Sequence, residues 1–216
     1  MPLQNRVTPF GDIVDDPARG MFMGNRGILH DGTRTLAAAR WRHPHWIICV
    51  TSFKSRHRDV MTPGKYTELF FSDEAAALAA GHRPCAECRR QAYNDFCRAW
   101  QIGHDAVGRI KAAAMDRALH PQRVNSRNRA QVTWRGNVSS LPDGTFFSAI
   151  DTPDIAVLIH GGHFWKWAFS GYSEIGEFGQ SFSTEDVVDV RTPESIVATL
   201  RAGYKPILHE SILSKI

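Results

Sequence analysis

The pattern of apolar and polar positions in the first half of the chain predicts a buried strand followed by helices. Residues 46–53 (WIICVTSF) form a largely apolar run, which is typical of a strand buried on both faces. Residues 75–80 are alanine and leucine and predict a short helix. Ser72 before this segment is a favourable N-cap, and Gly81 after it suits the left-handed position that ends a helix.

Two further helices are expected after this one. The second has an apolar face at spacings i, i+3, i+4 and i+7, formed by Tyr93, Phe96, Cys97 and Trp100. We interpret Cys97 as a core residue because free cysteine on an apolar face is commonly buried. The third helix is expected over residues 105–119.

The pattern changes to short strands separated by turns over residues 131–190. Pro142-Asp143-Gly144 is a turn signal, and Gly161-Gly162 between two apolar runs predicts a two-residue hairpin. No low-complexity linker separates this segment from the helical part. We therefore expect a single α+β domain over residues 1–216, with a helical Cys-x-x-Cys segment and a C-terminal antiparallel β region.

The composition is that of an ordinary soluble globular protein, with 43% hydrophobic and 22% charged residues in a chain of 216. No run of about 18 apolar residues is present, so no membrane span is expected. The N-terminus lacks a basic region followed by an apolar core, which is the mark of a secretory signal. We expect a cytoplasmic protein without membrane contact.

The charge is distributed unevenly along the chain. Residues 40–65 carry six Lys/Arg against one acidic residue, and residues 105–135 carry seven against two. Residues 136–216 carry five Lys/Arg against ten acidic residues. Basic segments on both sides of residues 70–90 would suit a phosphate backbone, although a solvated basic face needs no partner.

Cys85 and Cys88 form a Cys-x-x-Cys pair, which is half of a zinc site because two thiolates supply one edge of a tetrahedron. A redox function would need a thioredoxin-like βαβ context, which the neighbouring residues do not provide. Four cysteines in a cytoplasmic chain are more typical of thiols or metal ligands than of disulfides.

The pair needs further ligands from elsewhere in the chain. Cys49 on the predicted buried strand is the first candidate. His45 precedes it in a His-x-x-x-Cys spacing and is the second, while His57 and His82 are alternatives. We expect zinc to be held by Cys49, Cys85, Cys88 and His45.

Residues 70–90 carry a longer pattern, Phe-Phe-Ser, then Ala-Gly-x-Arg-Pro-Cys-x-x-Cys-Arg, over about a tenth of the chain. This segment resembles the metal-binding domain of the Ada methylphosphotriester-repair proteins and related zinc segments on DNA-handling proteins. The resemblance extends the candidate zinc-binding segment to residues 45–100. In that family two cysteines upstream of the helix complete a four-cysteine zinc site, and one of them accepts a methyl group from a DNA phosphate. Cys49 matches the first of them, whereas Phe53 stands four residues later where the second is expected.

The resemblance and the charge pattern together imply a nucleic-acid partner, with DNA favoured. The arginines expected to contact phosphate lie on both sides of the predicted zinc site. They are Arg83, Arg89, Arg90, Arg56 and Arg58.

A second candidate site lies on the third predicted helix. Asp116 and His120 are four residues apart and share a helix face, and Arg123 follows them. A carboxylate can orient an imidazole as general base, and an arginine can hold a phosphate, whereas the simpler interpretation is a surface ion pair. His30-Asp31 is a second pair that could join this site.

These observations favour a zinc-binding protein associated with nucleic acid, with a function in DNA repair or processing. The first alternative is a hydrolase or nuclease that acts on nucleic acid or a nucleotide through Asp116, His120 and Arg123. The second is a metal-free globular protein with reduced cysteines.

Overall fold

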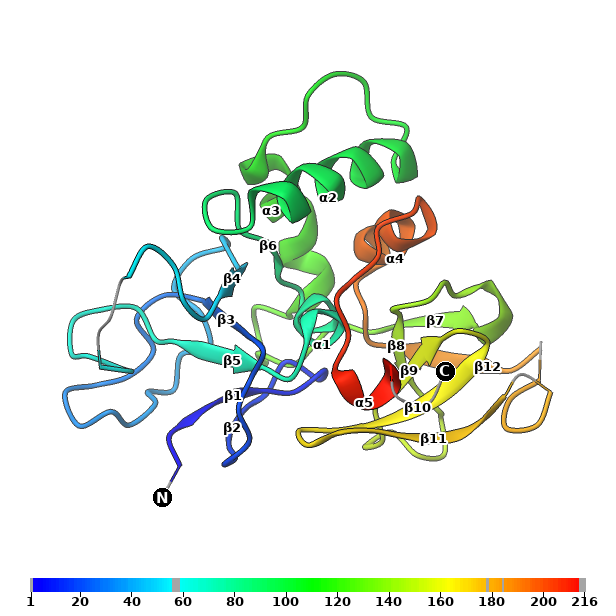
Figure 1. Cartoon of the computed structure of the whole chain (residues 1–216), viewed down its shortest axis with the longest axis horizontal. Coiled ribbons are helices and arrows are strands. Elements are labelled where there is room, and N and C mark those ends of the chain that lie inside the picture. The colour runs from blue at the N-terminus through cyan, green and yellow to red at the C-terminus, as the bar shows by residue number, and fades with distance from the viewer. Residues whose placement is uncertain (1, 56–58, 178, 184, 214–216) are drawn as a thin grey trace.

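The computed structural model describes residues 2–55, 59–177, 179–183 and 185–213, and it contains two six-stranded sheets (Figure 1). The first six strands form the N-terminal sheet, and they are β1 (Gln4–Val7), β2 (Ile13–Asp15), β3 (Phe22–Asn25), β4 (Ile47–Val50), β5 (Leu69–Phe71) and β6 (Arg83–Pro84). Their order in space is β2-β1-β5-β3-β4-β6. Two neighbouring pairs, β1/β5 and β4/β6, are parallel, and the others are antiparallel.

The second sheet lies within the segment expected to be β-rich. Its strands are β7 (Trp134–Asn137), β8 (Phe146–Ser148), β9 (Val157–His160), β10 (His163–Ala168), β11 (Gly171–Glu177) and β12 (Val187–Val190). All neighbouring pairs in the order β11-β10-β9-β8-β12-β7 are antiparallel. Gly161 and Gly162 join β9 to β10, and both have positive φ, as the predicted tight hairpin requires. Helices together with two sheets rich in antiparallel pairs confirm the α+β class.

The predicted alanine helix is α1 (Glu74–Ala79), which lies at the centre of Figure 1 between the two sheets. Ala75, Ala76 and Ala79 belong to a core cluster with aromatic residues of the C-terminal sheet. Ala77 and Leu78 belong to the core of the N-terminal sheet. The small side chains of its four alanines allow both sheets to pack closely against the helix.

The N-cap of α1 is Asp73 and not Ser72, which corrects the sequence prediction. The Asp73 carboxylate accepts a hydrogen bond from the Ala76 backbone N–H at 2.8 Å. Ser72 Oγ instead accepts a hydrogen bond from Trp167 Nε1 of the C-terminal sheet. Gly81 follows the helix with φ of 82°, as predicted for its C-terminal stop.

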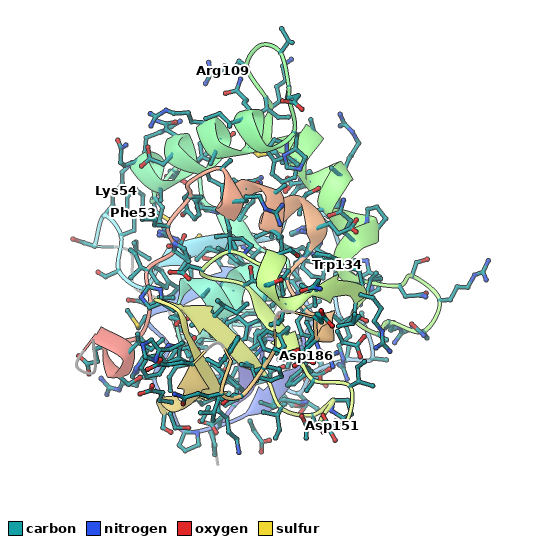
Figure 2. All side chains as sticks on the ribbon, turned by 90° about the vertical axis from the view of Figure 1, so that its right-hand side faces the viewer. Phe53, Lys54, Arg109, Trp134, Asp151 and Asp186 are labelled. Atoms are coloured by element: carbon teal, nitrogen blue, oxygen red, sulfur yellow. The ribbon has the colours of Figure 1, made fainter. Side chains whose placement is uncertain are left out.

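The second predicted helix is α2 (Arg90–Gly103), with Tyr93, Phe96 and Trp100 buried on its apolar face. Cys97 is half-buried and packs against the same core. The third, α3 (Ala112–Arg123), begins seven residues later than expected and continues past Pro121. Asp105 and Gly108 both have positive φ, so the backbone leaves the helical region there. Arg109 of this loop projects beyond α2 in Figure 2.

The remaining helical segments are η1 (Val138–Ser140), α4 (Glu194–Arg201) and α5 (Glu210–Leu213). In the described part of the chain no helix combines the length and the apolar character that crossing a bilayer would demand.

Candidate metal centre

The parallel pairing of β4 with β6 brings Cys49 next to the Cys-x-x-Cys pair. Ile48 is opposite Pro84 in the register, and the Cys85 backbone N–H donates to the Ile48 carbonyl at 2.9 Å. Cys85 and Cys88 lie in a turn between β6 and α2 and not within a helix, which differs from the predicted helical segment. The sulfur atoms of Cys49, Cys85 and Cys88 all lie within 4.8 Å of one another, and we refer to these residues as the cysteine cluster.

The spacing of the sulfurs fits a metal ion. Two sulfurs bound to one tetrahedral zinc ion at about 2.3 Å lie about 3.8 Å apart. The cluster therefore needs a contraction of at most about 1 Å to occupy three corners of such a tetrahedron. Three cysteines of this chain could thus hold a metal ion.

Hydrogen bonds within the cluster prepare Cys85 as a thiolate. Hydrogen bonds from the thiols of Cys49 and Cys88 lower the pKa of Cys85 well below its ordinary value. The Glu87 backbone N–H also donates to Cys85 Sγ at 3.4 Å. The pKa of Cys49 is raised, chiefly because its thiol donates to Cys85. Binding of a metal ion would release the remaining thiol protons, since metals bind thiolates.

Two buried ion pairs hold the turn on either side of the cluster. Arg83 donates from Nε and Nη2 to the two carboxylate oxygens of Asp116, each at 2.8 Å. Arg89 donates to the carboxylate oxygens of Glu74 at 2.6 and 2.9 Å. Tyr204 Oη and the Ile207 backbone N–H also donate to Glu74. These side chains fix the backbone from which the cluster projects.

The burial of these arginines corrects the expectation that they contact nucleic acid. Arg83 is 4% exposed and Arg89 is 8% exposed, and both guanidinium groups are bound to carboxylates. Arg90 is exposed at the first residue of α2 and stays available to a partner. Arg56 and Arg58 lie outside the described residues, as does His57.

His45 does not join the cysteine cluster, which corrects its assignment as a ligand. Its Nδ1 atom lies 2.8 Å from Asp116 Oδ2, so the imidazole is held by the carboxylate that also binds Arg83. The alternative ligand His82 is fully buried between Trp46 and Phe71, and burial lowers its pKa well below the ordinary value. Within the described residues, no further His, Cys, Asp or Glu completes the cluster.

The cysteine cluster lines a cavity of about 520 Å³ on the face of the N-terminal sheet. Most of the remaining lining is apolar or aromatic and includes Met23, Ile47, Val60, Tyr66 and Phe70. Phe53, where a fourth cysteine is expected by resemblance, also lines it, and Figure 2 shows Phe53 and Lys54 on the loop after β4. A metal ion in the cluster would therefore lie at a cavity of the size that accepts a small molecule.

Glu68 is a buried carboxylate in the same cavity that the sequence did not single out. Its Oε2 atom accepts a hydrogen bond from the Met61 backbone N–H at 2.8 Å, which orients the carboxylate. In the sequence Glu68 is simply a charged residue before a short apolar run. Its proximity to the cysteines depends on the pairing of β5 with β3 and of β3 with β4.

The site predicted from Asp116, His120 and Arg123 is not an acid–base pair. Asp116 is buried and bound to Arg83 and His45. His120 packs edge-on against Trp46 and lies 3.4 Å from Arg123 through its Nδ1 atom. Asp116 and His120 therefore have separate partners, and no hydrogen bond joins them in the described part of the chain.

The pair His30-Asp31 has partners of its own. His30 Nδ1 lies 2.7 Å from Thr67 Oγ1, and the Asp31 carboxylate accepts hydrogen bonds from the backbone of Thr33 and Thr35. Local turn geometry accounts for Asp31, whereas His30 is held by a residue distant in the chain. Among the residues that the structure describes, neither forms a hydrogen bond to Asp116.

No family model matches this chain, and neither a curated protein nor a solved structure is significantly similar to it. The function must therefore be argued from the chemistry of the site.

Proposed function

We propose that the cysteine cluster binds one zinc ion and that the protein associates with nucleic acid. The observation that carries the proposal is the convergence of three sulfurs from two distant segments of the chain. Thiolates favour zinc over magnesium or calcium, which prefer oxygen ligands. The backbone N–H donor on Cys85 Sγ and the ion pairs beside the turn are the kind of surroundings that tune a thiolate metal site.

Among the described residues the cluster offers three protein ligands, which distinguishes it from a closed structural site. A structural zinc ion usually has four protein ligands, whereas three leave a position for an exchangeable ligand. The cavity beside the cluster gives such a ligand room to enter. The ion therefore takes part in recognition or chemistry as well as in holding the strand to the turn.

Exposed basic residues support the nucleic-acid part of the proposal. Arg90 lies directly after the turn that carries the cluster. Further exposed cations lie on two loops, at Arg109 and Lys111 and at Arg127 and Arg129. They offer phosphate contacts in place of the buried Arg83 and Arg89.

Binding to labelled DNA and RNA oligonucleotides, followed by fluorescence anisotropy, tests this proposal. We expect the affinity of the zinc-loaded protein to fall steeply between about 50 and 200 mM salt. Arg90→Ala should reduce the magnitude of the salt slope by about 1, because one phosphate contact is lost. Arg98→Ala on the same helix is the matched control, since Arg98 is exposed but lies further from the cluster along α2 and pairs with Asp95. Absence of binding at low salt would refute the nucleic-acid association.

A hydrolytic activity at the cluster is the second candidate, and the position of Glu68 in the same cavity favours it. A zinc ion with an open position supplies Lewis acidity for a hydrolytic reaction. The Glu68 carboxylate would take a proton from the attacking water and return it to the leaving group. Overall, water adds across the cleaved bond, and no other co-reactant is needed.

Incubation of the zinc-loaded protein with nucleosides, nucleotides and oligonucleotides, with products identified by mass spectrometry, tests this second candidate. We expect Glu68→Gln to slow product formation by roughly 10²–10⁴-fold, the usual contribution of a general base. Its zinc content should stay that of the wild type, because Glu68 is outside the cluster. A wild-type protein that converts none of these compounds would contradict a hydrolytic function.

A further inference from the structure

A second cavity of about 320 Å³ lies apart from the cysteine cluster and has an unusually basic lining. Four arginines contribute to it, and they are Arg26, Arg40, Arg123 and Arg129. Asp12 is the one carboxylate among its described lining residues. A concave site with this excess of positive charge attracts an anion.

Two of these arginines are buried beside one tryptophan. Arg26 is 2% exposed and Arg123 is 3% exposed. The guanidinium carbon of Arg26 lies 4.1 Å from the ring centroid of Trp46, and that of Arg123 lies 4.0 Å from it. Burial lowers the pKa of each arginine to about 9, which leaves both cationic at neutral pH. Within the described residues, neither guanidinium has a carboxylate at ion-pair distance.

Each of these guanidinium groups has a donor without an acceptor. Arg26 Nη1 donates to the Gly11 carbonyl at 2.9 Å, and Arg123 Nη1 donates to the Gly81 carbonyl at 2.7 Å. Arg26 Nη2 and Arg123 Nε are buried and have no hydrogen-bond partner in the described part of the chain. An unsatisfied donor on a buried charge is unfavourable, so an anion that accepts from these groups would stabilise the folded protein.

The cavity also has adaptable cations at its edge. Arg40 donates to the Ala37 carbonyl, and Arg129 donates to the Ala38 carbonyl. Arg129 is exposed on the loop after α3 and Arg40 is half-buried, so both can turn toward a ligand. Arg26 and Arg123 would provide fixed donors, and Arg40 and Arg129 would close over the anion.

We propose that this cavity binds a phosphate group. Several guanidinium forks around one site are the arrangement that recognises phosphate oxygens. Binding of phosphate in this cavity does not require the metal centre, since none of the cluster cysteines lines the cavity. The further inference that this phosphate belongs to the end of a nucleic acid or to a nucleotide rests on the proposed function.

Isothermal titration calorimetry on the full-length protein tests the proposal with three probes. They are inorganic phosphate, a nucleoside monophosphate, and an oligonucleotide with or without a 5′-phosphate. We expect saturable binding of the phosphate-bearing probes, and tighter binding of the oligonucleotide when it carries the 5′-phosphate. Binding of inorganic phosphate and of the monophosphate with no gain from the 5′-phosphate would assign the cavity to free phosphate compounds. The absence of saturable binding of any phosphate probe at millimolar concentration would overturn the proposal.

Two variants on one loop distinguish binding in the cavity from non-specific attraction by positive charge. Arg129→Ala should weaken binding of inorganic phosphate at least about tenfold, because a hydrogen bond to a charged group is lost. Arg127→Ala removes the same charge from the same loop at a residue outside the cavity lining and should bind phosphate as the wild type does. Arg26→Gln should abolish binding, with circular dichroism as the check on its fold.

Equal phosphate affinity in Arg129→Ala, Arg40→Ala and the wild type would place the anion elsewhere and overturn the proposal. Repeating the titration with Cys85→Ser distinguishes this inference from the metal proposal. Phosphate binding should persist in that variant even though zinc is lost.

Discussion

Replacing Cys85 with serine is expected to lower the zinc content from about one ion per chain to near zero. Cys85 accepts hydrogen bonds from the other two thiols of the cluster and from the Glu87 backbone, so it is the centre of the site. The remaining Cys49 and Cys88 supply two ligands, which is too few for a stable zinc site. Metal analysis of the purified protein measures the loss.

Thermal unfolding extends this prediction to stability. The wild type should lose stability when a chelator removes zinc, because binding to the folded state contributes to its free energy of unfolding. Cys85→Ser should melt near the chelated wild type and should not respond further to the chelator. Cys97→Ser is the matched control, since Cys97 is a half-buried cysteine outside the cluster. A Cys85→Ser protein that retains zinc would contradict the assignment of the cluster.

Replacing Glu74 with leucine is expected to destabilise the protein by about 3–5 kcal/mol. Glu74 is buried and accepts hydrogen bonds from Arg89, Tyr204 and the Ile207 backbone. Its loss leaves the guanidinium of Arg89 buried without a counter-charge. The same contacts attach the C-terminal segment to α1. Because α1 packs against both sheets, we expect the loss of stability to extend to both.

Urea denaturation or calorimetry measures this effect, and a drop in Tm of roughly 6–20 °C is expected for a chain of this length. Asp95→Ala breaks the exposed Arg98–Asp95 pair and should change the free energy of unfolding by less than about 1 kcal/mol. Because Arg89 follows Cys88 directly, Glu74→Leu should also weaken zinc binding. Similar stability of the two variants would show that the buried pair is not a major determinant of folding.

Local signals in the sequence were sufficient for several elements. The apolar face of α2, the Gly161-Gly162 hairpin and the glycine stop after α1 each depend on residues close together in the chain. Interactions among near neighbours decide such features, so a single sequence reveals them. The predicted start of α3 at residue 105 is too early, because the backbone has positive φ at Asp105 and Gly108 and the helix begins at Ala112.

The roles of the charged residues could not be predicted in the same way. From the sequence alone, Arg83 and Arg89 are predicted to contact phosphate, since both lie beside the Cys-x-x-Cys pair. In the folded protein their partners are Asp116 and Glu74, which are 33 and 15 residues away. A buried ion pair and a solvent-facing cation have the same sequence signature, and only tertiary packing separates them.

The sequence predicts only part of the candidate site, because the rest of the site also depends on tertiary packing. Cys49 was correctly grouped with Cys85 and Cys88 from ligand chemistry and a local resemblance. His45 was not, because the Asp116 carboxylate that holds it belongs to a distant helix. Glu68 and Arg26 are not singled out by the sequence, since each reaches its cavity through the folding of separate segments. Arg123 is predicted to hold a phosphate beside Asp116 and His120, but the cavity that it lines contains Arg26 and neither of those two residues.

X-ray absorption spectroscopy at the zinc edge of the purified protein directly counts the sulfur atoms bound to the metal. We expect zinc with three sulfur neighbours at about 2.3 Å and one nitrogen or oxygen neighbour at about 2.0–2.2 Å. Measurement of His57→Ala alongside the wild type determines whether that lighter neighbour comes from a residue outside the described part of the chain. Four sulfur neighbours, fewer than three, or a protein without zinc would contradict a three-cysteine centre that opens to a cavity.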